Sequence, residues 1–183
     1  MKHIFLTLSL ISTALLMAAF VMGMSIDDPT VRTEEVAASV NLHMGTAMFA
    51  LIAAAMVHSL ALTYFMGTGR WMEETSRAYR LGESKSAESR SMKYRMMLGM
   101  IGCLVMLIVT LALGASIDSN VWKGFTEYGI AASTIHFLTA SVTICLNMFV
   151  NMQEYQAISR NGQLVDEVMV EVRRMRTERG LPV

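Results

Sequence analysis

The stretch that decides the fold is residues 41–71, NLHMGTAMFALIAAAMVHSLALTYFMGTGRW. It is an almost uninterrupted apolar run, and it carries two of the four histidines of the chain, His43 and His58. A helix needs about 20 apolar residues to cross roughly 30 Å of hydrocarbon, so this stretch is long enough to span a bilayer. We expect the rest of the chain to embed this helix, to orient it and to cover its histidine face.

Three further apolar blocks accompany this stretch in a chain of 183 residues, of which 54% are hydrophobic. The predicted spans are 4–24, 38–67, 96–115 and 129–150, and none contains Asp, Glu, Lys, Arg or Pro. Lipid cannot satisfy exposed backbone groups, so such spans form helices. The sequence predicts an all-α, polytopic integral membrane protein with a bundle of four transmembrane helices in residues 1–151. The length of the first block, about 20 residues, favours a helix over a cleaved signal peptide.

The polar segments lie between and after these blocks. Residues 68–95 are expected to form a loop, with GESKSAESRS (82–91) as a polar turn, although its first part can extend the second helix. Residues 152–183 are expected to form a separate amphipathic tail, because apolar residues recur there at helical spacing. A break between the fourth helix and the tail is expected at 160–162, and the second helix is expected to begin at about Glu34.

The distribution of basic residues predicts the orientation. Residues 68–95 and the tail from 152 together carry twelve Lys and Arg, whereas the segments 25–37 and 116–128 carry one each. Basic residues are enriched on the cytoplasmic side of membrane proteins. We therefore predict a multi-pass protein of a bacterial-type inner membrane, with both termini in the cytoplasm.

Two predicted helices carry stripes of small and polar residues. Steps of three and four residues place such side chains on one face of a helix. Small residues allow close approach of membrane helices, and hydroxyl and amide groups bond between them. The fourth helix has Ser133, His136, Ala140, Thr143, Asn147, Asn151 and Glu154 in its stripe, and the third has Gly99, Cys103, Met106, Thr110 and Gly114. These two faces are expected to pack against each other inside the bundle.

The histidine side of the second helix is built from alanines. His43, Ala47, Ala50, Ala54 and Ala61 fall within about 40° of one line, and His58 lies about 60° from it. Alanine beside histidine leaves space either for a neighbouring helix or for a flat cofactor such as haem. The sequence is compatible with both.

His136 is the first candidate for a cofactor ligand, since an ionisable residue inside a membrane segment indicates a functional site. Two histidines that ligate one haem iron must lie at similar depth. His43 and His58 are about 22 Å apart along their helix, and His136 lies between their levels, so either can be its partner. A second haem is disfavoured, because Val150 and Asn151 stand where the fourth helix would need another histidine. One haem with two histidine ligands and a haem ligated by His and Met both remain open.

A further group of residues is expected at the inner membrane surface. Arg70 and Trp71 can anchor the end of the second helix at the level of the headgroups. Together with Tyr64 and Glu154 they can instead contact a partner protein or the head group of a quinone.

Several classes of protein are disfavoured by absent motifs. The chain has no Ser-His-Asp order, phosphate-binding glycine loop, HExxH or CxxC, so an autonomous enzyme with a soluble active site is not expected. Cys103 and Cys145 both fall within membrane blocks, which excludes a disulfide framework. The zero net charge gives no bulk attraction to nucleic acid. The scattered methionines are typical of apolar filling rather than a copper site.

The four predicted spans and the histidines within them favour a small membrane subunit that binds one b-type haem or a quinone within an electron-transfer complex. Its helix count and histidine placement are similar to those of the four-helix membrane anchors of respiratory complexes, a likeness of architecture without a shared motif. A cofactor-free scaffold or accessory subunit is the alternative, and a proton or metal-ion carrier is a third. The expected partners are membrane lipid and other membrane subunits or further copies of the chain.

Overall fold

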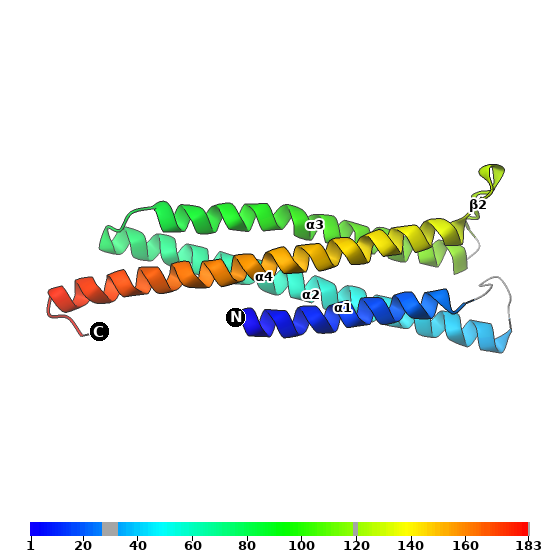
Figure 1. The fold of residues 1–183 in the computed structure, drawn as a ribbon, viewed down its shortest axis with the longest axis horizontal. Helices are drawn as coiled ribbons and strands as arrows, with labels where there is room; N and C mark the ends of the chain where they lie inside the picture. The colour runs from blue at the N-terminus through cyan, green and yellow to red at the C-terminus, as the bar shows by residue number, and fades with distance from the viewer. Residues whose placement is uncertain (27–32, 119–120, 183) are drawn as a thin grey trace.

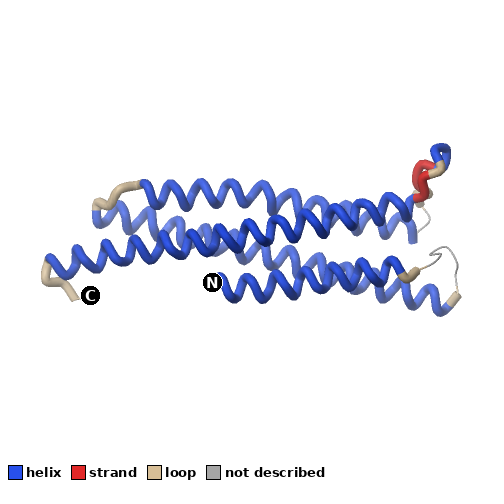
Figure 2. Tube along the Cα trace, viewed as in Figure 1, coloured by secondary structure: helices blue, strands red, loops and turns tan. Residues whose placement is uncertain are grey.

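The computed structural model describes residues 1–26, 33–118 and 121–182. Within this part the chain is all-α apart from one small hairpin (Figure 1). The helices are α1 (Lys2–Met24), α2 (Glu34–Tyr79), α3 (Ser84–Asp118) and α4 (Ala132–Glu178). The hairpin consists of β1 (Gly124–Phe125), the 3₁₀ turn η1 (Thr126–Tyr128) and β2 (Ile130–Ala131). It lies at one end of the bundle (Figure 2), which we call the hairpin end; the other we call the turn end.

All four helices are long and apolar enough to cross a membrane. Large apolar side chains cover their outer faces, among them Leu98 and Met56, which are 76% and 67% exposed. Contiguous apolar surface of this kind is unusual on a soluble monomer. The four-helix architecture predicted from the sequence is therefore confirmed, including the start of α2 at Glu34, where Thr33 accepts a hydrogen bond from the Val36 backbone N–H.

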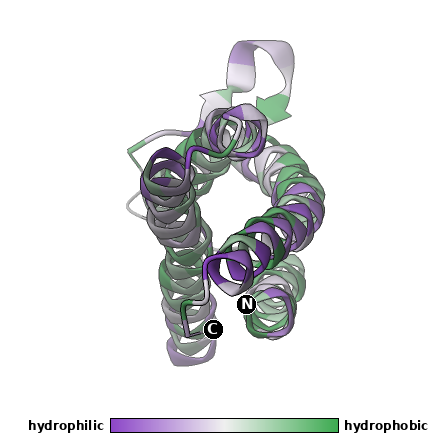
Figure 3. Cartoon of the chain, turned by 90° about the vertical axis from the view of Figure 1, so that its left-hand side faces the viewer, coloured by the Kyte–Doolittle hydropathy of each residue, from purple (hydrophilic) through white to green (hydrophobic). Residues whose placement is uncertain are grey.

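Three of the helices are much longer than a bilayer is thick. At 1.5 Å per residue, the 46 residues of α2 and the 47 of α4 each extend about 70 Å, whereas the 23 of α1 extend about 35 Å. The N-terminus accordingly lies partway along the bundle (Figure 1). Beyond it, residues 68–79, 84–95 and 159–178 continue as a three-helix stalk, which has hydrophilic surface towards the turn end (Figure 3).

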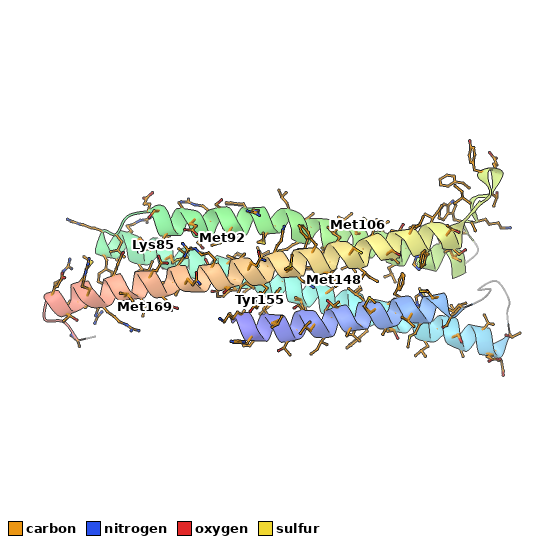
Figure 4. The ribbon with its side chains drawn as sticks, viewed as in Figure 1. Lys85, Met92, Met106, Met148, Tyr155 and Met169 are labelled. Atoms are coloured by element: carbon orange, nitrogen blue, oxygen red, sulfur yellow. The ribbon has the colours of Figure 1, made fainter. Side chains whose placement is uncertain are left out.

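The stalk replaces the long loop that the sequence predicts at 68–95. Only residues 80–83 separate α2 from α3, so the prediction that GESKSAESRS is a turn is wrong for most of its length. Charged side chains of this segment pair with side chains of α4. Lys85 Nζ lies 2.6 Å from a carboxylate oxygen of Glu171, and Arg160 donates two hydrogen bonds to the Glu88 carboxylate. Figure 4 shows Lys85 within the stalk.

The predicted break in the last helix is also absent. α4 runs through Asn161 and Gly162 without interruption to Glu178. A helical glycine costs about 1 kcal/mol relative to alanine, and the surrounding contacts offset this cost. The Asn161 amide donates to the Thr68 hydroxyl at 2.7 Å and accepts from Ser89 at 2.6 Å, while Leu164 and Val168 are buried against the other stalk helices.

The core consists of three apolar clusters along the bundle axis. Near the hairpin end, Leu16, Ala50, Ala54, Leu107 and Ile144 pack together. The middle cluster contains Phe5, Val57, Ala61, Phe65, Met96, Met100, Ala157 and Ile158. The stalk cluster is Met72, Leu164 and Val168. Polar groups lie at other levels of the same interior.

The predicted contact between the stripes of α3 and α4 is confirmed. The hydroxyls of Thr110 and Thr143 are 2.7 Å apart. A Cβ built on Gly99 would lie 3.2 Å from a methyl carbon of Val150, so the absence of a side chain at 99 allows α4 to approach. Gly102, on a different face of α3, has nothing within 4 Å of such a Cβ.

These two glycines give a matched test of the packing. We expect Gly99→Leu to destabilise the bundle in detergent by about 1–3 kcal/mol, because an overpacked interface forces helices apart. Gly102→Leu should leave the thermal unfolding midpoint close to that of the wild type. Equal midpoints for the two variants would contradict the assigned α3–α4 interface.

The stalk should weaken in acid. Hydrogen bonding to Arg160 lowers the pKa of Glu88, so this stabilisation is present above the ordinary glutamate range, about 4.3, and is lost as the pH falls through the lowered pKa. Both side chains are about 40% exposed, so the pair contributes little to stability. We expect Glu88→Gln to lower the unfolding midpoint slightly at neutral pH and to match the wild type once the pH lies below the lowered pKa of Glu88.

Candidate functional site

A cavity of about 520 Å³ lies between the four helices at the hairpin end. This volume is within the usual range for cofactor and ligand sites, about 300–1,000 Å³. Its walls are mostly apolar and come from every helix, for example Phe20 of α1, Ala47 of α2, Leu107 of α3 and Phe137 of α4. Two histidines line it, His43 from α2 and His136 from α4.

The imidazole rings of His43 and His136 lie close together. Their centroids are 6.3 Å apart, and the ring planes are nearly perpendicular, at 84°. An imidazole nitrogen binds a first-row metal at about 2.0–2.1 Å and lies about 1.1 Å from its own ring centroid, so two rings that bind one metal from opposite sides stand about 6.3 Å apart. The observed centroid separation matches that value. The structure thus selects His43, rather than His58, as the neighbour of His136.

A backbone hydrogen bond fixes the orientation of His43. Its Nδ1 lies 2.9 Å from the backbone carbonyl of Ala19. A carbonyl can only accept, so Nδ1 carries the proton and donates it, and Nε2 of the neutral ring keeps its lone pair. Metal-bound histidines almost always donate their other N–H in this way.

Each of the two imidazole rings rests against a glycine. A Cβ at Gly114 would lie 3.1 Å from Cε1 of His136, and a Cβ at Gly23 would lie 2.9 Å from Cε1 of His43. A side chain at either position would displace the neighbouring imidazole. Nδ1 of His136 is buried and has no hydrogen-bond partner in the described part of the chain.

Hydroxyl groups supply the polar part of the cavity wall. Thr110 and Thr143 bond to each other on its inner side, and Ser133 and Thr134 line it on the first turn of α4, next to the hairpin. His, Cys, Asp and Glu side chains form no group of three suited to a metal ion among residues 1–26, 33–118 and 121–182. A metal held by His43 and His136 would therefore need further ligands from a cofactor.

His58 lies in a different environment, in the middle of the bundle. It is 2% exposed, and its Nδ1 lies 2.8 Å from a carboxylate oxygen of Glu154, which is completely buried. Its Nε2 lies 3.4 Å from the Asn147 amide nitrogen, and the Asn151 amide donates to Asn147 at 3.2 Å. Both ring nitrogens are engaged, so neither is available to a metal.

The four residues expected at the inner surface do not form one site. Glu154 pairs with His58 inside the bundle, and Tyr64 packs against the middle core cluster. Arg70 is 82% exposed and bonds to Glu74 on its own helix, while Trp71 packs against the stalk cluster. Arg70 lines a small groove with Arg90 and Lys93, in which the other three do not take part.

Two parts of these sites were missed by sequence reasoning. The roles of Ala19 and Gly23 have no sequence signal, because their partner is on another helix. The pairing of Glu154 with His58 had a signal, since Glu154 continues the polar stripe of α4 at steps of three and four. Its position next to the polar tail favoured a surface location instead.

Neither a protein-family model, nor a curated protein, nor a solved structure matches this chain.

The His58–Glu154 pair can be tested by breaking it and then removing it. We expect His58→Leu to destabilise the protein by about 3–5 kcal/mol, because an uncompensated carboxylate remains buried. The double variant His58→Leu/Glu154→Leu should recover much of this loss, as apolar replacements of both partners are often tolerated. Unfolding in detergent measures both. A double variant as unstable as the single one would contradict the pairing.

Proposed function

We propose that this protein is a small integral membrane subunit for electron transfer that binds one b-type haem between His43 and His136. One observation carries the proposal: the two imidazoles, from different helices, line one cavity with their ring centroids 6.3 Å apart. That spacing suits two axial ligands of one iron.

The surroundings favour haem over a bare metal ion. His43 and His136 supply only two nitrogens, and no third His, Cys, Asp or Glu joins them within the described residues. A porphyrin brings the four remaining ligands of an octahedral iron itself. Its flat, apolar ring also suits a cavity walled by Phe20, Leu107 and Phe137.

Each part of the site has a distinct task in this proposal. His43 and His136 would be the axial ligands, and the Ala19 carbonyl would hold His43 in its ligating tautomer. The apolar walls exclude water, and the hydroxyls of Ser133 and Thr134 can donate to the haem carboxylates. A haem held by both His43 and His136 would supply one-electron exchange rather than a binding position for a substrate. This arrangement suits an electron carrier.

The proposed setting is a bacterial-type inner membrane with the hairpin end facing outward and the stalk in the cytoplasm. The Lys and Arg asymmetry of the sequence supports this orientation. Lipid would surround the four spans, and the stalk offers surface to other subunits or to a second copy. A quinone in the same cavity is the second candidate ligand, favoured by the predominantly apolar walls.

An absorption spectrum tests the haem directly. The full-length protein purified in detergent should show a Soret band and, after dithionite, a sharp α-band. His43→Ala and His136→Ala should each lose these bands, whereas His58→Gln should keep them, because His58 lies outside the cavity. A wild-type spectrum without haem bands would overturn the proposal, and quinone extraction would then test the second candidate.

Two glycines provide a matched pair for the cavity geometry. Gly114→Val should lower the haem content per protein, because the new side chain meets the ring of His136. Gly45→Val introduces the same group on α2, where nothing lies within 4 Å of the new Cβ, and should retain haem. Equal retention by the two variants would show that the His136 ring does not depend on the space at Gly114.

A further inference from the structure

A second site lies deeper in the bundle, in the group that we call the inner polar cluster: His58, Asn147, Asn151 and Glu154. Their exposed fractions are 2%, 1%, 7% and 0%. His58 is 15 residues from His43, or about 22 Å along α2. Among the residues described, His58 and Glu154 are the only side chains of the His, Lys, Arg, Asp or Glu types that are buried. Ionisable groups at such depth are costly and mark functional sites.

The hydrogen bonds define the protonation state that this geometry holds. The Asn147 amide nitrogen lies against Nε2 of His58 and can only donate, so Nε2 accepts and carries no proton. Nδ1 therefore carries the ring proton and donates it to the Glu154 carboxylate at 2.8 Å. His58 is neutral in this arrangement, and with Glu154 ionised the cluster holds one negative charge.

Two acceptors in the cluster remain unsatisfied. The second carboxylate oxygen of Glu154, Oε2, and the side-chain oxygen of Asn151, Oδ1, are buried without a hydrogen-bond partner within the described residues. Each unsatisfied buried group costs about 1–3 kcal/mol. A charge that is uncompensated in the low dielectric of the membrane interior costs more. The cluster thus lacks positive charge and hydrogen-bond donors.

One added proton corrects both deficits if the two amides turn over. The oxygen and nitrogen of an asparagine amide have nearly the same shape, so each amide can rotate by 180° within the same space. With Asn147 turned, its oxygen accepts from a protonated Nε2 of His58. With Asn151 turned as well, its formerly unsatisfied oxygen accepts from the Asn147 nitrogen, and its own nitrogen becomes a free donor.

We propose that the inner polar cluster is a proton-binding site, in which His58 takes up one proton at Nε2 when the haem is reduced. The uptake turns a lone carboxylate into an imidazolium–carboxylate pair with no net charge. This coupling rests on the proposed haem function. The electron would come from an external reductant and the proton from water, and the one new bond in the protein would be the N–H at Nε2 of His58.

Electrostatics connects the two sites. The added electron leaves one more negative charge inside the bundle, and a positive charge on His58 offsets it through a medium that screens weakly. The thiol of Cys103, on α3, is a titratable group near Glu154. The buried residues of α1 are Phe5, Ser9, Ser12, Leu16 and Ala19. None of these side chains gains or loses a proton near neutral pH.

The test is a redox titration of the purified full-length protein over a range of pH. The haem midpoint potential should fall as the pH rises in the wild type, and this dependence should be reduced in His58→Gln and Glu154→Gln. Glu88→Gln is the matched control, since it removes an exposed carboxylate in the stalk, and it should keep the wild-type dependence. All of these variants should retain the haem bands.

A second measurement follows the proton itself. With nitrogen-isotope-labelled histidine, magnetic resonance should show one ring that changes from neutral to protonated on reduction, and this signal should be absent in His58→Gln. Haem with the same pH dependence in wild type, His58→Gln and Glu154→Gln would overturn the proton site and leave the haem proposal standing. A wild type without haem would overturn both. Loss of folding in one variant leaves the other variant and the labelled wild type to decide.

Discussion

The structure depends on the inability of lipid to form hydrogen bonds. Every polar group on a membrane-spanning helix must find its partner inside the bundle or remain unsatisfied at a cost. The stripe on α4 is where this constraint acts most strongly. It forces α4 to turn towards α3 at Thr143 and towards α2 at Asn147 and Glu154. The arrangement of the bundle follows from these contacts as much as from its apolar clusters.

Small residues decide how the interior is divided between packing and open space. Where α2 presents Ala50 and Ala54, side chains from the other three helices fill the space and make a core cluster. Where the same face presents Ala47 beside His43, the space remains open as the cavity. The alanine face thus packs against the other helices at one depth and lines an open cavity at another.

The stalk follows a different physical rule, because it lies beyond the reach of α1. There water competes for hydrogen bonds, and the helices combine an apolar cluster with charged pairs across their outer edges. Exposed pairs of this kind contribute little individually. The buried bonds of Asn161 to Thr68 and Ser89 fix the register between the three helices more strongly, since an unpaired partner would be left in a dry interior.

The sequence by itself determined the number of membrane spans, the beginning of α2 and the faces through which α3 and α4 pack. These properties depend on local composition and on the period of one helix, and both can be counted along the chain. It also identified His43, His58 and His136 as the ionisable residues of the spans.

Only the tertiary structure decided which of these histidines meet. The choice between His43 and His58 as the neighbour of His136 depends on the relative shift of α2 and α4 along the bundle, and no local pattern encodes that shift. The same applies to Ala19, whose role is a carbonyl presented by α1, and to Glu154, whose partner is 96 residues away. The stalk was missed for a related reason: a polar segment such as 84–91 has little helical signal alone and becomes helical through its contacts with α4.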